Sequence, residues 1–148
     1  MQNTHTLDFS GQTVVITGAS RGIGLGVARV FANQGATLHI IAQDDGIHDA
    51  ARTLANETGQ DITSWMCDIT DGKAIDRVFS EIGPVDVFVA NAGLEAVTPI
   101  ADQSDAAEGM FRRVIDVNVT GTYLSTRAAV AQMQAGGRVI ITASIWGT

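Results

Sequence analysis

Short apolar runs alternate along the chain with stretches whose apolar residues recur every three or four positions. The first run, Thr13–Thr17, is β-branched and apolar at its centre, which is typical of a strand buried on both faces. The stretch Gly22–Asn33 has apolar residues at helical spacing, and Gly35 follows it as a helix-ending glycine. We therefore predict a strand followed by a helix at the start of the chain.

The same alternation continues to the last residues. Further strands are predicted at 37–42, 62–67, 85–90 and 138–143. Further helices are predicted at 47–58, at 70–82 with Thr70 as N-cap, and at 104–133 with Gly136 and Gly137 closing the last one. Such alternation implies an α/β fold, in which a parallel sheet is covered on both faces and ligands bind beyond the carboxyl ends of the strands.

A glycine-rich loop, TGASRGIG at 17–24, joins the first strand to the first helix. Gly18 allows a sharp turn, Gly22 lets backbone N–H groups approach a diphosphate, and Gly24 lets the helix pack closely on the sheet. The N-terminus of the helix then faces the diphosphate with free N–H groups. The spacing differs from the G-x-G-x-x-G dinucleotide fingerprint, and a flexible surface turn is the alternative interpretation.

Composition narrows the class of protein. The 148 residues carry a net charge of -7, which disfavours nucleic acid and anionic membranes as partners. The single Cys, Cys67, and three scattered His residues disfavour a disulfide framework or a metal site. We find neither an apolar run long enough to span a bilayer nor a signal-peptide pattern, so we expect a cytoplasmic protein of one domain.

The chain carries several motifs in a fixed order: TGASRGIG at 17–24, CDIT at 67–70, ANAG at 90–93, IDVNVTGTY at 115–123 and GRVIITAS at 137–144. By these motifs it resembles the short-chain dehydrogenase/reductase family. The resemblance implies a Rossmann-type doubly wound parallel sheet of order 3-2-1-4-5. It also implies an NAD(P)-dependent oxidoreductase that transfers hydride between nicotinamide and a small alcohol or carbonyl substrate.

The resemblance also implies which residues hold the cofactor. Asp68 matches an Asp that accepts a hydrogen bond from the adenine amino group, and 91–93 matches a loop that runs beside the cofactor ribose. Ala90 stands where the family has a first Asn before that loop. The expected cofactor-binding residues are Gly18, Ser20, Arg21, Gly22, Ile23, Gly24, Gln43, Asp68, Ile69, Asn91, Ala92 and Gly93.

Two residues match catalytic positions of the family. Ser144 matches a Ser that hydrogen-bonds the substrate oxygen, and Asn118 matches an Asn that holds a water in the proton relay. The substrate oxygen gains or loses a proton as hydride moves, so it needs such partners. An ordinary strand-end serine and an asparagine that merely bridges backbone are the alternatives.

The family's catalytic Tyr, with a Lys one helical turn later, lies on a helix after the fifth strand. Tyr123 and Lys73 are the only Tyr and Lys here, and neither matches. We therefore expect an N-terminal portion of an oxidoreductase, incomplete at its C-terminus and inactive alone. A non-catalytic dinucleotide-binding module and an inactive fragment stay open as alternatives.

The end of the second strand bears on the choice between NAD and NADP. Ala42 stands where NAD-using members carry Asp, and Gln43 stands where many NADP-using members carry Arg. Asp44 and Asp45 follow, with no basic residue nearby in sequence, so NAD is favoured, although Arg21 could reach a 2′-phosphate.

The long helix at 104–133 bears on assembly. Arg112 and Arg113 are expected on its solvated face. The resemblance implies a homo-oligomer, a dimer or a tetramer, formed through this helix and the helix expected after the fifth strand.

Overall fold

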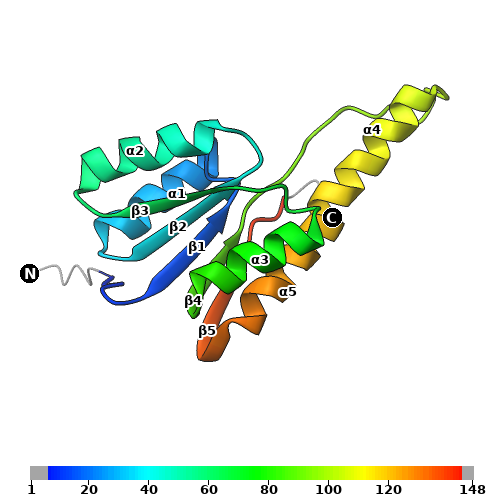
Figure 1. Ribbon diagram of the computed structural model, residues 1–148. Helices are drawn as coiled ribbons and strands as arrows, with labels where there is room; N and C mark the ends of the chain where they lie inside the picture. The colour runs from blue at the N-terminus through cyan, green and yellow to red at the C-terminus, as the bar shows by residue number, and fades with distance from the viewer. Residues whose placement is uncertain (1–6, 145–148) are drawn as a thin grey trace, which may run out of the picture.

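The computed structural model describes residues 7–144, and its sheet is parallel with the order β3-β2-β1-β4-β5 (Figure 1). The strands are β1 (Thr13–Thr17), β2 (Thr37–Ala42), β3 (Ile62–Met66), β4 (Val85–Ala90) and β5 (Met133–Ile141). The helices are α1 (Gly22–Asn33), α2 (Gly46–Thr58), α3 (Gly72–Ile82), α4 (Asp105–Ile115), the π-helix η1 (Asp116–Gly121) and α5 (Thr122–Ala131). The predicted Rossmann-type fold class and strand order are confirmed.

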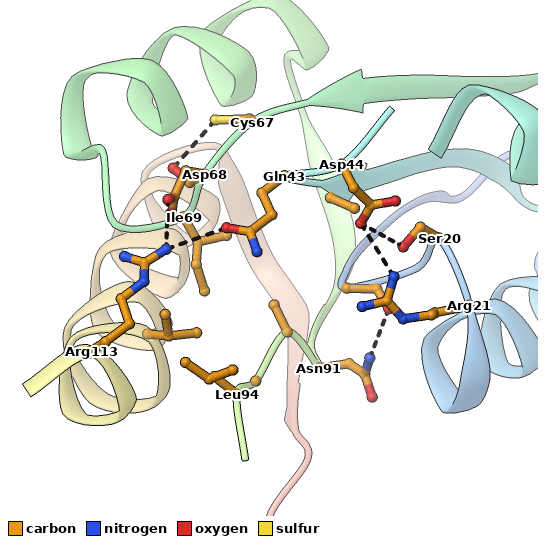
Figure 2. Close-up of a pocket in the computed structure, with 15 residues that line it drawn as sticks. Ser20, Arg21, Gln43, Asp44, Cys67, Asp68, Ile69, Asn91, Leu94 and Arg113 are labelled. Atoms are coloured by element: carbon orange, nitrogen blue, oxygen red, sulfur yellow. Dashed lines mark hydrogen bonds and ion pairs between the residues drawn. The ribbon is translucent and has the colours of Figure 1, made fainter. Parts of the chain in front are cut away.

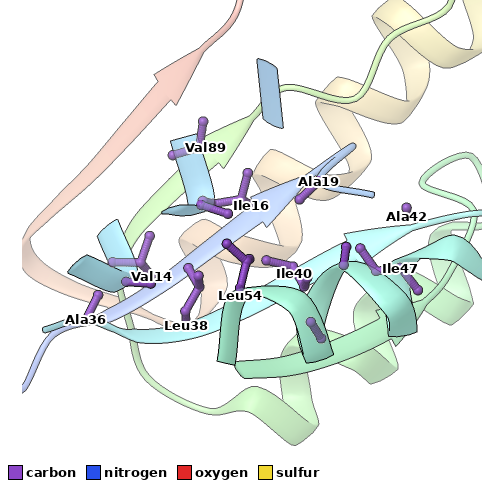
Figure 3. Packing of buried hydrophobic residues seen from close by; sticks show 14 of the residues in the cluster. Val14, Ile16, Ala19, Ala36, Leu38, Ile40, Ala42, Ile47, Leu54 and Val89 are labelled. Carbon is purple, nitrogen blue, oxygen red and sulfur yellow. The ribbon is translucent and has the colours of Figure 1, made fainter. Parts of the chain in front are cut away.

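Each face of the sheet has its own hydrophobic core. Val14 and Ile16 of β1 pack in the core with residues of α1 and α2 (Figure 3). Val15, between them, joins the other core with residues of α3 and α5. All three are fully buried, because a central parallel strand is covered on both sides. On the second face the rings of Phe79 and Phe88 meet edge to face, with their centroids 5.5 Å apart.

The N-cap of α3 differs from the prediction. Asp71, not Thr70, caps the helix: its Oδ1 accepts hydrogen bonds from the amides of Lys73 and Ala74, at 3.1 and 3.0 Å. Thr70 is engaged elsewhere, because its amide and its hydroxyl both donate to Asp68. The prediction of Thr70 was wrong by one position, since two adjacent residues both had cap chemistry.

The predicted long helix is continuous in space but contains three segments. The α-helices α4 and α5 flank the π-helix η1, in which Asn118 lies. A π-helical turn inside an α-helix is uncommon and often occurs at functional sites. Figure 1 shows α4 extending away from the sheet, and none of its residues is buried.

The last strand begins earlier than predicted. The helix ends at Ala131, and Met133 already pairs with Val85 of β4. The next pair is Val87 with Arg138, so residues 134–137, including the glycine pair, form an irregular excursion within β5. The prediction that Gly136 and Gly137 close the helix is therefore wrong, because both lie within β5. Within the described sheet β5 is an edge strand, and its apolar side chains are exposed.

Candidate functional site

A cavity of about 230 Å³ opens at the carboxyl ends of β1 to β4, where the sequence predicts a ligand (Figure 2). Most of the predicted cofactor-binding residues line it together: Gly18, Ser20, Arg21, Gln43, Asp68, Ile69, Asn91, Ala92 and Gly93. The structure places the remaining three, Gly22, Ile23 and Gly24, in the first turn of α1, next to the loop rather than in the cavity wall.

The glycine loop depends on two glycines in particular. Gly18 has a φ of +67°, and a Cβ there would lie 2.7 Å from the Cα of Ala92. A Cβ on Gly24 would overlap the carbonyl oxygen of Gly18 and lie 2.6 Å from the side-chain Nδ2 of Asn91. Turn and close packing therefore both require glycine, as the sequence predicts.

The first turn of α1 has no capping hydrogen bond from its N-cap side chain. The N-cap residue is Arg21, whose guanidinium has no acceptor, so it cannot cap the backbone amides of the first turn. Free N–H groups at a helix N-terminus attract an anion. The helix start is therefore suited to a phosphate group.

Asn91 joins three strand ends. Its Nδ2 donates to the carbonyls of Thr17 and Gly18, both at 3.2 Å, and its Oδ1 accepts from the Thr142 hydroxyl, also at 3.2 Å. The buried hydroxyl of Thr17 in turn accepts from the amides of Asn91 and Ala92, each at 3.1 Å. This network fixes the loop after β4 against the glycine loop.

Asp68 lies at the end of β3 with both oxygens in use. Oδ1 accepts from the Thr70 amide at 2.9 Å and from its hydroxyl at 2.8 Å, and Oδ2 accepts from Arg113 at 2.9 Å. Partial burial raises the pKa of Asp68, but the Thr70 amide, Arg113 and the Thr70 hydroxyl together outweigh it, so the pKa lies below its usual value. Asp68 is therefore a fixed, ionised acceptor.

Arg113 was missed as a site residue by the sequence analysis. It was expected on a solvated helix face, yet it lines the cavity and reaches Asp68 and Gln43 (Figure 2). Val117, one helical turn later, lines the same cavity. The signal that could have found both is their i, i+4 spacing immediately before Asn118, which puts them on one helix face.

A carboxylate at the end of β2 engages the glycine loop. Asp44 Oδ2 accepts from the Ser20 hydroxyl at 3.0 Å and lies 3.8 Å from Arg21 Nη1. Asp44 also lines the cavity, and the sequence analysis had not placed it in the site. Ala42, two residues earlier, has no group that could bind a ribose. At the end of β2, the carboxylate that lines the cavity is therefore that of Asp44.

The predicted relay residue Asn118 contacts the loop after β4. Its Oδ1 accepts from the Leu94 amide at 2.7 Å, and its Nδ2 donates to the Leu94 carbonyl at 2.9 Å. An amide group has two donors and two lone-pair sites, so one of each remains available. Asn118 thus bonds the backbone of the loop after β4 rather than that of its own helix, and keeps capacity for a water.

The predicted catalytic serine, Ser144, lies just beyond β5 and is exposed. It is not among the residues that line the cavity. It is two residues after Thr142, whose hydroxyl bonds Asn91, so it lies at the same edge of the sheet as the cavity. Trp146, two residues further on, could by its sequence position line a substrate pocket or serve as an aromatic packing residue, and it lies outside the described residues.

Residues 7–144 contain no cluster of three or more His, Cys, Asp or Glu side chains that could bind a metal ion. Within the same residues, no helix combines the length and the apolar character needed to cross a bilayer.

The fold and this cavity agree with comparisons to known proteins. The profile of the family described as short chain dehydrogenase matches residues 12–148. The chain therefore belongs to the short-chain dehydrogenase family.

Two curated relatives illustrate the range of the family. The "Cyclic-di-GMP-binding biofilm dispersal mediator protein" of Escherichia coli is 36% identical over 143 residues, covering 94% of this chain and 56% of that protein. "Cis-4-hydroxycyclohexanecarboxylate dehydrogenase" of Sinomonas cyclohexanicum is 37% identical over 134 residues, covering 87% of this chain and 52% of that protein. The chain thus spans about half the length of these relatives.

Solved structures show the same architecture. A short-chain type dehydrogenase/reductase from Mycobacterium marinum has a TM-score of 0.88 and 33% identity, covering 96% of this chain and 59% of that one. NAD+-bound xylitol dehydrogenase has a TM-score of 0.82 and 30% identity, covering 94% and 55%. BdcA in complex with NADPH has a TM-score of 0.77 and 35% identity, covering 94% and 54%.

Proposed function

We propose that this chain forms the dinucleotide-binding part of an NAD(P)-dependent oxidoreductase that transfers hydride between nicotinamide and an alcohol or carbonyl substrate. The observation that carries the proposal is the cavity itself, where the glycine loop, Asp68 and the loop 91–93 meet at the carboxyl ends of the strands. Related structures bind NAD+ in one case and NADPH in another, which supports a nicotinamide dinucleotide as the cofactor.

Different residues of the cavity bind different parts of the cofactor. The diphosphate lies over the start of α1, where free amides and the helix dipole favour negative charge. Asp68 accepts a hydrogen bond from the adenine amino group, next to Ile69, and the loop 91–93 lies beside the ribose. Bound there, the nicotinamide supplies the hydride chemistry, and the protein supplies orientation and proton transfer.

NAD is the preferred cofactor in this proposal. A 2′-phosphate needs an unpaired cation, but Arg21 lies beside Asp44, and Arg113 is paired with Asp68. The carboxylate of Asp44 would also repel a phosphate. Titration of the full-length protein with both cofactors tests this preference, and NADP binding more than about tenfold tighter than NAD would contradict it.

Proton transfer in the proposed reaction involves Ser144 and Asn118. Ser144 hydrogen-bonds the substrate oxygen and Asn118 holds a relay water, whereas the family's Tyr and Lys have no counterpart at matching positions here. The full-length protein should reduce NAD with an alcohol from a panel of small alcohols, detected by the absorbance of reduced nicotinamide. The chain alone should bind the cofactor without turnover.

A non-catalytic dinucleotide-binding module is the second candidate. It is favoured by the name of the Escherichia coli relative, which describes the binding of cyclic-di-GMP rather than a reaction. The two candidates differ in turnover. NAD binding by the full-length protein with no oxidation of any alcohol in the panel would favour the binding module.

Family membership also supports a proposal about assembly and location. We propose a cytoplasmic homo-oligomer, a dimer or tetramer. Its contact surface is an exposed apolar face of α4, η1 and α5, formed by Phe111, Ile115, Val119 and Tyr123.

A further inference from the structure

Two adjacent arginines of α4 have opposite surroundings. Arg112 is 74% exposed and pairs with Glu108 one turn earlier in its own helix. Arg113 is 38% exposed and turns toward the sheet, although no residue of α4 is buried. Its hydrogen bonds go to residues 43 to 70 positions away in sequence. Arg113 therefore links α4 to the ends of β2 and β3 (Figure 2).

The guanidinium of Arg113 fixes how its partners are oriented. Nη2 donates to Asp68 Oδ2 at 2.9 Å and to Gln43 Oε1 at 3.3 Å, and Nη1 donates to the Thr70 hydroxyl at 3.3 Å. A guanidinium has donors only, so the amide oxygen of Gln43 must face it and the amide NH2 group must face away. The Thr70 hydroxyl accepts a hydrogen bond from Arg113 and donates one to Asp68 Oδ1.

The carboxylate of Asp68 retains one lone-pair site that can accept a hydrogen bond from a ligand. Each carboxylate oxygen has about two lone-pair sites. The two donors of Thr70 fill Oδ1, whereas Arg113 occupies one site of Oδ2 and leaves the other. Since Asp68 lines the cavity, the free site of Oδ2 is an acceptor presented there, and Arg113 sets its direction.

We propose that Arg113 is a positioning residue that makes the cavity selective for a nucleotide base with an exocyclic amino group. It acts by holding Asp68 Oδ2 as an acceptor at a fixed position, with the amide of Gln43 oriented by the same guanidinium. A base with an amino group donates to this oxygen, and a base with a carbonyl at the same place is repelled by it. The proposal rests on the proposed function, because it assigns the base end of the same dinucleotide site.

Base selectivity is measured with a matched pair of dinucleotides. NAD carries the adenine amino group, and nicotinamide hypoxanthine dinucleotide replaces it with a carbonyl. We expect the full-length wild-type protein to bind NAD at least about tenfold more tightly by calorimetry, as expected for a hydrogen bond to a charged group. In Arg113→Met this ratio should fall to about threefold or less, because Asp68 loses its fixed orientation.

Two further variants separate orientation from charge. Arg112→Met removes the same charge from the next position and should leave the ratio at the wild-type value. Arg113→Lys keeps the charge, but a single ammonium lacks the planar fork in which Nη1 reaches Thr70 while Nη2 reaches Asp68 and Gln43, so its ratio should also fall. This variant carries the test if Arg113→Met does not fold.

The outcomes distinguish this proposal from the one on which it rests. If the wild-type protein binds neither dinucleotide, the proposed cofactor site is wrong. If it binds both equally, or if both Arg113 variants keep the wild-type ratio, the cofactor site stands and the role of Arg113 is overturned.

Discussion

His39 of β2 lies beside Trp65 of β3, and the state of its ring matters to the fold. Trp65 Nε1 donates to His39 Nδ1 at 3.2 Å, and the two rings stack with centroids 6.2 Å apart. The hydrogen bond requires Nδ1 to be unprotonated. Burial lowers the pKa of His39, in agreement with this neutral form.

Stability should therefore fall in mild acid. The unfolded chain takes up a proton at His39 near a pKa of about 6.5, whereas the folded protein resists it to lower pH. The contribution is complete above that value and is lost as the pH falls toward the folded pKa, by at most about 1.4 kcal/mol per pH unit. Urea unfolding at several pH values measures it, and His39→Gln should remove this part of the slope. An unchanged slope in that variant would show that His39 is not its source.

At the scale of elements, the sequence predicts the strands and helices well where periodicity is strong. The bounds of β1, β2, β4 and α1 agree with the prediction, because each has a continuous apolar run or a helical stripe between clear breakers. The π-helix and the early start of β5 could not be predicted, since both depend on contacts with β4 and the loop after it.

In the site, too, residues with local roles could be predicted, and residues that depend on long-range contacts could not. Gly18 and Gly24 could be identified because their roles are local to one turn. The spacing before Asn118 could place Arg113 on the helix face of the site, but its partner could not be predicted, because Asp68 lies 45 positions away and the bond depends on how α4 meets the sheet. Motif spacing therefore predicts the glycine-rich loop, whereas the tertiary fold determines which other residues line the cavity.

The N-cap of α3 gives a prediction at this scale. Asp71→Ala should lower the free energy of unfolding by about 1 kcal/mol, because two amides of a helix packed on the core lose their acceptor. Chemical denaturation measures the change. Ser104→Ala removes the cap of α4, which has no buried residue, so its global effect should be smaller. Equal losses in the two variants would contradict this explanation.

For the whole molecule, the apolar side chains of α4, η1 and α5 are its most informative exposed surface. Phe111, Ile115, Val119 and Tyr123 recur at four-residue spacing, and each is 43% to 64% exposed. A clustered apolar face of this kind marks an interaction surface. In the proposed function it is covered by a second copy of the protein.

Assembly can be tested with two matched valines. Val119 of η1 and Val30 of α1 are both 59% exposed, so a charge at either costs the isolated fold a similar amount. Val119→Glu should shift the full-length protein toward smaller assemblies in light scattering, whereas Val30→Glu should not. A monomeric wild-type protein, or equal masses for both variants, would contradict the proposed surface.

Calorimetric titration of the full-length protein with NAD tests whether the cavity is a dinucleotide site. We expect saturable binding of NAD with one site per chain, and weaker binding of NADP, because Arg21 and Arg113 are already placed against carboxylates. Absence of saturable NAD and NADP binding at millimolar concentrations would contradict this expectation, since the cavity at the carboxyl ends of the strands would then serve another ligand.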